Sequence, residues 1–187
     1  MSFNLPNYIS TESGADLLRT AERVLVIGCS GGGKTTLSLK LAARFKLEYL
    51  SLDRDVRWLP RWTERDRNLQ REILTELVKR STWVMDGSGS STFDIRLRRA
   101  DLVIWLRVPR HVALRGVAIR VFKNLGTVRV AMAEGCREKI PDLEFLSYIW
   151  NFEKIQAPKF IEKIDMFGSD VPVVVLKSHS EISTLFI

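Results

Sequence analysis

Cysteines are scarce in this 187-residue chain, and long apolar runs are absent. The two cysteines are Cys29 and Cys136, and neither their number nor their spacing suggests a disulfide framework or a metal site. No stretch approaches the roughly twenty uninterrupted apolar residues of a membrane-spanning helix. The first residues also lack the basic start and apolar core of a secretory signal. We therefore expect neither a disulfide-stapled secreted protein nor a membrane protein, and we expect a cytoplasmic location.

The composition is that of an ordinary globular protein, with 45% hydrophobic and 27% charged residues. At this length the expectation is one domain with a proper core. We expect residues 22–187 to form that single domain. Residues 1–21 are expected to be an N-terminal extension, either a helix packed on the outside or a loosely ordered tail. Nothing in the sequence indicates the oligomeric state.

A glycine-rich segment carries the clearest chemical signal. Residues 28–35 fit the pattern G-x-x-x-x-G-K-[ST], between an apolar strand-like run and a helical stretch. Glycines let successive backbone N–H groups point at an anion, and the following helix adds the positive end of its dipole. We expect Lys34 to reach the β- and γ-phosphates of a nucleoside triphosphate and Thr35 to ligate Mg²⁺. The candidate phosphate-binding residues are Gly28, Ser30, Gly31, Gly32, Gly33, Lys34, Thr35 and Thr36.

Apolar strand-like runs alternate with helical segments along the rest of the chain. The expected strands are residues 24–28, 47–52, 82–85, 101–106 and 171–176. The expected helices are residues 34–45, 64–80, 110–123 and 142–166, with a short one after residue 178. Such alternation predicts a three-layer α/β fold with a central five-stranded parallel sheet. Residues 124–141 are irregular, and we expect them to form a short mobile lid.

Two acidic residues stand where expected strands end. Asp86 closes the 82–85 strand, and an acid there can hold Mg²⁺ opposite the phosphate loop. The alternative is a cap on the following turn, a role that Asp fills well. Asp53 follows the 47–52 strand, where it can orient an acceptor hydroxyl while Arg54 or Arg57 holds an acceptor phosphate. The alternative is a surface turn of alternating charges.

Positive charge is concentrated in one part of the chain, whose net charge is +7. Residues 96–139 hold eleven lysines and arginines against three acids. This segment is suited either to attracting a nucleic-acid backbone or to clamping a transferred phosphoryl group, and most of its side chains can also simply be solvated. We find no DNA-binding module and no aromatic stacking pattern beside it.

The chain resembles the adenylate-kinase-related P-loop proteins of the DNA topology modulation type, over about residues 22–187. The segments that carry the resemblance are residues 26–37, 52–53, 83–87, 92–97, 100–106, 134–140 and 176–178. Two of these segments are far more specific to this family than the phosphate loop, which many families share: Asp94-Ile95-Arg96-Leu97 and Gly135-Cys136-Arg137-Glu138-Lys139. The resemblance implies a nucleoside-kinase-like P-loop fold with a phosphate-donor site and a short lid.

The resemblance also implies roles for individual residues. Lys34 would hold the donor phosphates, Thr35 and Asp86 would serve Mg²⁺, and Arg96 would hold the acceptor side. The lid-side arginines would be Arg115, Arg120 and Arg129. The chain departs from true adenylate kinases in residues 86–90, which lack their acceptor-phosphate arginine, and in its shorter lid.

Two functions from different classes remain open at this stage. The first is a phosphotransferase that moves the γ-phosphate of Mg-ATP to a small acceptor, either a nucleotide or a hydroxylated metabolite, with Asp53 orienting the acceptor. The second is a nucleic-acid-associated ATPase or nucleotide switch that affects DNA topology. ATP is expected over GTP because no N-K-x-D guanine-reading motif is present.

Overall fold

The computed structural model describes residues 6–186. The strands in this range are β1 (Tyr8–Ile9), β2 (Arg23–Gly28), β3 (Tyr49–Ser51), β4 (Trp58–Leu59), β5 (Thr63–Glu64), β6 (Trp83–Asp86), β7 (Leu102–Leu106) and β8 (Val173–Leu176). The α-helices are α1 (Thr11–Leu17), α2 (Lys34–Phe45), α3 (Arg67–Leu77), α4 (Phe93–Arg96), α5 (Arg110–Asn124), α6 (Leu143–Gly168) and α7 (His179–Thr184). A π-helix, Leu52–Arg57, follows β3, and short 3₁₀ turns occupy Pro60–Trp62, Ser90–Thr92 and Leu97–Arg99.

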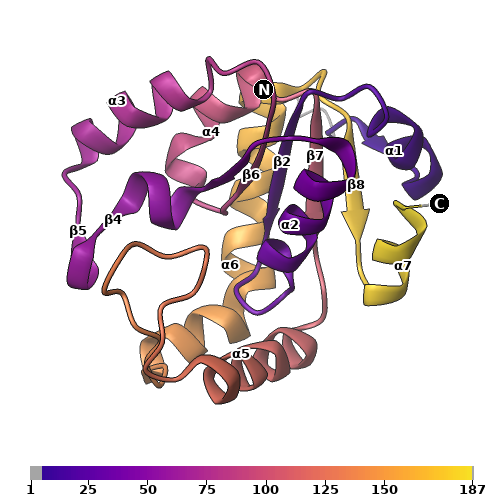
Figure 1. Cartoon of the computed structure of the whole chain (residues 1–187). Coiled ribbons are helices and arrows are strands. Elements are labelled where there is room, and N and C mark those ends of the chain that lie inside the picture. Colours follow the sequence, from indigo (N-terminus) through magenta and orange to yellow (C-terminus); the bar gives the residue numbers. More distant parts are fainter. Residues whose placement is uncertain (1–5, 187) are drawn as a thin grey trace.

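The main sheet is parallel, with the strand order β1-β8-β7-β2-β6-β3 (Figure 1). The expected three-layer α/β fold is confirmed, but the sheet has six strands and not the five expected. The additional strand is β1, in which Tyr8 and Ile9 pair with Val173 and Val174. Two residues are too few to show a strand period in the sequence, and their hydrogen-bonding partner lies some 165 residues away.

The N-terminal extension is thus part of the domain from residue 6 onward, while its residues 1–5 lie outside the described range. Its helix α1 begins at Thr11 and is capped by Ser10, whose hydroxyl accepts a hydrogen bond from the backbone N–H of Ser13. Gly14 brings this helix close to β8, since a Cβ on Gly14 would lie 2.3 Å from a methyl group of Val174. Of the two expectations for this segment, the packed helix is the one observed.

Alternate residues of β2 point to opposite faces of the sheet, and each face is buried under helices. Val24 and Val26 join a cluster with residues of α2, α7 and the end of α1, whereas Leu25 and Ile27 join the larger cluster with α3, α5 and α6. All four side chains have no exposed surface. Burial on both faces explains why β2 is read in the sequence as a continuous apolar run.

The segment after β3 differs from the sequence prediction. The expected strand at 47–52 is only Tyr49–Ser51, because the chain turns into the π-helix at Leu52. An antiparallel pair, β4 and β5, follows the π-helix and was not expected. The next helix, expected at 64–80, begins after Asp66, whose carboxylate accepts hydrogen bonds from the N–H groups of residues 68 and 69.

The lid segment connects α5 to α6 and has little regular structure. Isolated bridges join Leu125 to Glu138 and Val128 to Arg137, so its two ends run side by side. The helix that follows is one continuous element of 26 residues with Pro158 inside it. Figure 1 shows the lid as the orange loop beside β4 and β5, with α5 and the start of α6 beneath it.

The order of the strands brings the carboxyl ends of three strands together. β2 lies between β7 and β6, so Gly28, Leu106 and Asp86 end neighbouring strands at the carboxyl edge of the sheet. In open parallel sheets this edge is where ligands bind. Within residues 6–186, no helix has both the length and the apolar character that crossing a membrane requires.

Candidate functional site

The phosphate loop joins β2 to α2 in a conformation that only glycine adopts easily. Gly28, Gly31 and Gly33 have φ angles of 140°, 82° and 96°. A Cβ on Gly28 would lie 2.2 Å from the carbonyl oxygen of Leu106, and one on Gly31 would lie 2.1 Å from that of Ala113. The loop is therefore held against β7 on one side and α5 on the other.

The remaining residues of the loop lead into α2. Lys34 starts α2, and its ammonium group donates a 3.0 Å hydrogen bond to the carbonyl oxygen of Cys29 inside the loop. Ser30 is half-buried, Gly32 is buried, and Thr36 is exposed on the first turn of α2. Cys29 is shielded from solvent, and its burial raises the pKa of the thiol to about 11, so this cysteine is a packing residue at neutral pH.

Thr35 and Asp86 meet across the ends of β2 and β6. The Thr35 hydroxyl donates a 2.5 Å hydrogen bond to the Asp86 carboxylate, and the Tyr49 hydroxyl lies 3.4 Å from the same oxygen. Asp86 is buried, which raises the pKa of its carboxyl group, while the nearby Lys34 ammonium acts in the opposite direction. A buried carboxylate beside a hydroxyl and an ammonium group is a suitable site for a phosphate-bound cation.

These groups fit Mg²⁺ by their chemistry. Mg²⁺ prefers oxygen ligands and keeps several waters, so one hydroxyl and one carboxylate beside phosphate oxygens are sufficient. Within residues 6–186 no cluster of three or more His, Cys, Asp or Glu side chains could hold a metal by itself. A metal at this position would depend on the substrate's phosphates as well as on Thr35 and Asp86.

Ser88 is a site residue that the sequence did not indicate. Its hydroxyl accepts a 2.8 Å hydrogen bond from the N–H of Gly28 and donates a 2.6 Å one to the carbonyl oxygen of the same residue. The loop after β6 is thereby fixed to the start of the phosphate loop. The only signal in the sequence is that a serine follows Asp86-Gly87, which is too common to interpret.

Asp53 lies on the π-helix after β3, in partial contact with solvent. Its negative charge contributes to raising the pKa of Asp86 and opposes the lowering of the pKa of Arg120, so it lies within electrostatic reach of both groups. Among residues 6–186 no side-chain or backbone group donates a hydrogen bond to its carboxylate. Asp53 thus follows the carboxyl end of β3, and its role toward an acceptor stays a prediction.

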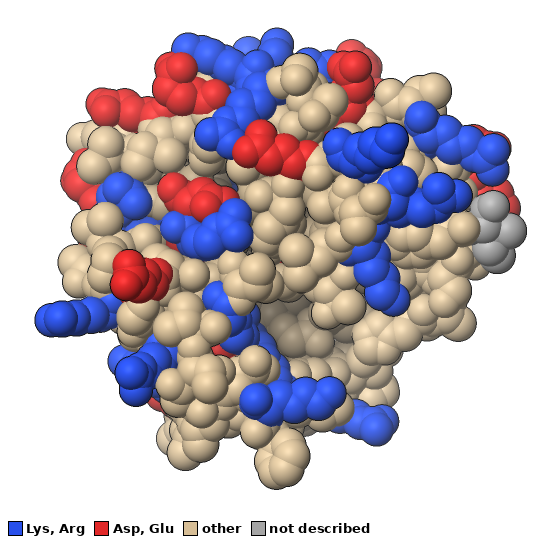
Figure 2. Space-filling model, in the orientation of Figure 1, with Lys and Arg blue, Asp and Glu red and all other residues tan. Residues whose placement is uncertain are grey.

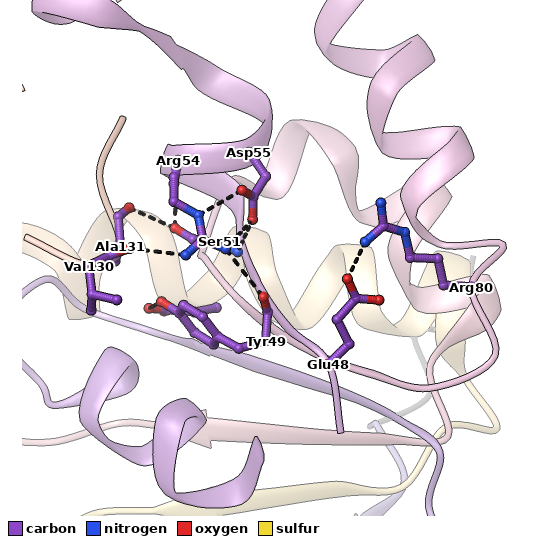
Figure 3. A network of polar contacts seen from close by, with 9 residues as sticks. Glu48, Tyr49, Ser51, Arg54, Asp55, Arg80, Val130 and Ala131 are labelled. Atoms are coloured by element: carbon purple, nitrogen blue, oxygen red, sulfur yellow. Dashed lines mark hydrogen bonds and ion pairs between the residues drawn. The ribbon is translucent and has the colours of Figure 1, made fainter. Parts of the chain in front are cut away.

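The lid is hydrogen-bonded to the end of β3 (Figure 3). The Ser51 hydroxyl donates to the carbonyl oxygen of Ala131, at 2.8 Å, and Arg54 donates to that of Val130, at 3.1 Å. Arg54 is itself held by Asp55, to which it donates at 2.7 and 2.9 Å. Arg54 thus serves as a structural link, while its neighbour Arg57 is exposed and pairs with Glu64.

A second set of contacts joins the lid to β4 and β5. The indole N–H of Trp62 donates to the carbonyl oxygen of Arg137, and the backbone N–H of Trp62 lies 3.2 Å from the sulfur of Cys136. Trp58 and Trp62 pack against the buried lid residues Met132, Ala133 and Cys136. The lid therefore rests on the segment 51–64, which contains Asp53, the residue expected to orient an acceptor.

Two of the expected lid arginines come together. Arg120 and Arg129 each donate from Nε to Glu138, at 2.8 and 2.5 Å. Burial lowers the pKa of Arg120, and the charge of Arg129 adds to this effect. Arg115 is separate from this pair and exposed on α5, next to the glycine that packs on the phosphate loop. Figure 2 shows a hollow on this face of the molecule with basic side chains along one side.

Arg96 is placed differently from its expected role at the acceptor side. Its side chain has no exposed surface, and its guanidinium group donates to the carbonyl oxygens of Gly87 and Gly89 and to the hydroxyl of Thr92. Burial lowers the pKa of Arg96 to about 9. In this arrangement Arg96 shapes the loop after β6 and presents no surface to a ligand.

Comparisons with known proteins give structural matches and no sequence matches. No family model matches the chain, and no curated protein matches it significantly. Shikimate kinase from Acinetobacter baumannii in complex with shikimate superposes with a TM-score of 0.60 at 17% identity, covering 92% of this chain and 93% of the other. Shikimate kinase from Bacteroides thetaiotaomicron gives 0.54 at 18% identity, with 89% and 95% covered. Shikimate kinase from Aquifex aeolicus gives 0.52 at 14%, with 88% and 93% covered. The chain is similar to these kinases in fold, over nearly its whole length.

Proposed function

We propose that the protein is a phosphotransferase that moves the γ-phosphate of Mg-ATP to a hydroxyl group of a small acceptor. The observation that carries the proposal is the contact between Thr35 and the buried Asp86 beside a complete phosphate loop. A glycine-rich turn that only closed a βα unit would need neither this pair nor Lys34 at its start. The fold shared with the shikimate kinases is consistent with this chemistry but does not establish it.

The residues of the loop would hold the donor. Backbone N–H groups of the loop would donate to the phosphates at the N-terminus of α2, where the helix dipole favours negative charge. The Lys34 ammonium group donates a hydrogen bond to a carbonyl oxygen of its own loop. On nucleotide binding it would donate to the phosphates instead. Thr35 and Asp86 would hold Mg²⁺, which neutralises charge on the β- and γ-phosphates when bound.

Asp53 would orient the acceptor. Its carboxylate has no protein donor within residues 6–186 and is able to accept a hydrogen bond from a hydroxyl group, which aligns the attacking oxygen. The shikimate bound by one structural neighbour is a hydroxylated acid, and hydroxylated metabolites of that kind are the first acceptors to test, followed by nucleotides. Positioning by these residues supplies most of the rate enhancement in phosphoryl transfer.

The structure supports the alternative, a nucleic-acid-associated ATPase, less than the sequence does. Two arginines of the basic segment are engaged by the protein itself, Arg96 by carbonyl oxygens and Arg107 by Glu153. Fewer charges are therefore available to a DNA backbone than the sequence indicated. DNA remains a partner to test and not one that the site requires.

The test follows γ-labelled phosphate from ATP in the presence of Mg²⁺, across shikimate, other hydroxylated acids and nucleoside monophosphates. Label is expected on one acceptor with the wild-type protein and on none with Lys34→Ala. Asp53→Ala is expected to retain Mg-ATP binding and lose transfer by roughly 100-fold or more. Release of free phosphate alone, accelerated by DNA, would favour the ATPase instead, and equal loss of ATP binding in both variants would refute the role of Asp53.

A further inference from the structure

Glu138 is the buried carboxylate of the lid. Its side chain is 3% exposed, and each of its two oxygens accepts one arginine, Oε1 from Arg120 and Oε2 from Arg129. Taking a carboxylate out of water is costly unless it is paired and hydrogen-bonded. The two arginines satisfy Glu138, and Glu138 fixes both guanidinium groups relative to one another.

The cluster carries more positive than negative charge. Two guanidinium groups share one carboxylate, which leaves one net positive charge in a half-buried position. The pKa of Arg120 is lowered first by burial and then by the neighbouring charge of Arg129, so the two cations repel one another. The negative charge of Asp53 opposes this lowering of the pKa without a hydrogen bond to either arginine. An added anion would relieve both the repulsion and the excess charge.

The orientation of the two arginines leaves their terminal nitrogens available to donate hydrogen bonds to an oxyanion. Both use Nε toward Glu138, and among residues 6–186 no acceptor is bonded to their four terminal nitrogens. Arg120 also lies over the ring of Phe145, with 5.7 Å between the guanidinium carbon and the ring centroid. Terminal guanidinium nitrogens match the spacing of carboxylate and phosphate oxygens.

We propose that Glu138 is a positioning residue that holds Arg120 and Arg129 as a fork for one oxyanion. This inference deepens the proposed function and rests on it. The oxyanion is either the γ-phosphate of the donor or an anionic group of the acceptor. The charge of Asp53 acts both on Arg120 of the fork and on Asp86 of the candidate metal site, which links the fork electrostatically to the proposed site of transfer.

The test measures binding and needs no turnover. Affinities for Mg-ADP and for the Mg²⁺ complex of the β,γ-imido analogue of ATP are compared by calorimetry, and inorganic phosphate is then titrated into the Mg-ADP complex. If the fork takes the donor, the wild-type protein prefers the triphosphate by about tenfold or more, the scale of a hydrogen bond to a charged group. Glu138→Gln then loses that preference while its Mg-ADP affinity is unchanged, and Glu138→Asp recovers part of it.

If the fork takes the acceptor, Glu138→Gln keeps the wild-type preference for the triphosphate and instead loses phosphate binding to the Mg-ADP complex. Arg129→Gln is expected to reproduce either result and serves in place of Glu138→Gln should that variant not fold. Arg137→Gln, an exposed arginine of the same lid, is the matched control and should change neither affinity. Unchanged binding of both probes in Glu138→Gln and Arg129→Gln, or an equal loss of Mg-ADP affinity, would overturn the inference. Failure of the proposed function is separate, since it would show as absent transfer with the fork's binding intact.

Discussion

The Thr35 hydroxyl and the Asp86 carboxylate are joined by a 2.5 Å hydrogen bond across 51 residues of sequence. The bond exists because β2 and β6 are neighbouring parallel strands, in which Val26 is in register with Asp86. The two residues that the sequence assigns separately to Mg²⁺ therefore meet through the topology of the sheet. The charge of Asp86 is needed to hold a cation, but because the side chain is buried, the same charge lowers the stability of the folded protein.

Asp86→Asn is expected to stabilise the ligand-free protein while it abolishes phosphate transfer. Burial raises the pKa of Asp86, so the folded state binds this proton more tightly than the unfolded chain does. The ionised carboxylate costs stability, and asparagine removes that cost while it keeps an oxygen that accepts from Thr35. The Tm should rise, by about 2–4 °C for each kcal/mol gained, and turnover should fall by roughly 100-fold or more.

The stability of the protein depends on pH through Asp86. The contribution of this group to stability is fully present below its ordinary pKa of 3.8 and is lost as the pH rises through the raised pKa of the folded state. The difference in Tm between Asp86→Asn and wild type should therefore grow with rising pH over that window. A difference that is flat with pH, or a less stable variant at neutral pH, would contradict the role of buried charge. Activity should rise over the same window, because the ionised form holds the cation.

Gly116→Ala is expected to weaken nucleotide binding although the substitution lies on a helix. A Cβ at this position would lie 2.1 Å from the carbonyl oxygen of Gly31. Because this atom belongs to the backbone, it cannot move aside by a side-chain rotation. Alanine gains about 1 kcal/mol of helix propensity over glycine, which is less than the cost of displacing the phosphate loop. The Kd for Mg-ADP should rise by about tenfold or more. Ala118→Ser, exposed on the same helix, is the control and should leave the Kd unchanged; an unaltered Kd in Gly116→Ala would show that the loop tolerates the shift.

The parts of the fold that the sequence predicted are those determined by local pattern. The phosphate loop, β2 and α2 follow from glycines, a buried apolar run and helical spacing, and α2 begins and ends where expected, at Lys34 and Phe45. Strand β1 was missed because its only evidence is pairing with β8. The π-helix was missed because its six residues have no distinct sequence period.

The roles of charged residues were less predictable, since a charge in the sequence does not show what neutralises it. Arg96 was expected at the acceptor side because of the resemblance to the adenylate-kinase-related proteins, yet three oxygens of its own loop surround it. Glu138 received no role, although it is one of only three acids among eleven basic residues of the segment 96–139. That imbalance was the available signal that Glu138 would be paired by arginines.

Arg96→Lys is expected to destabilise the protein without changing its affinity for nucleotide. Lysine cannot make the planar set of contacts to Gly87, Gly89 and Thr92, and the loop carbonyls would lose their donors inside the core. The free energy of unfolding should fall by about 2–4 kcal/mol, measured by urea denaturation. Arg98→Lys, exposed two residues away, should have no measurable effect. A lost affinity for an acceptor in a fully stable Arg96→Lys protein would instead support the ligand role that the resemblance implied.

Arg54→Ala is expected to release the lid from the end of β3. The guanidinium group of Arg54 donates to the carbonyl oxygen of Val130 while Asp55 holds it in place, so its removal leaves Ser51 as the side chain joining β3 to residue 131 (Figure 3). Local opening of the lid should then become more frequent, because opening breaks fewer hydrogen bonds. Limited digestion with trypsin should cut the lid at Arg129, Arg137 or Lys139 several-fold faster than in the wild type. Lys79→Gln removes a cation whose ion pair with Glu76 is exposed, and it should leave the rate of lid cleavage unchanged. Equal cleavage in Arg54→Ala and wild type would mean that the hydrogen bond from Ser51 and the contacts of Trp62 with Arg137 and Cys136 are sufficient to hold the lid.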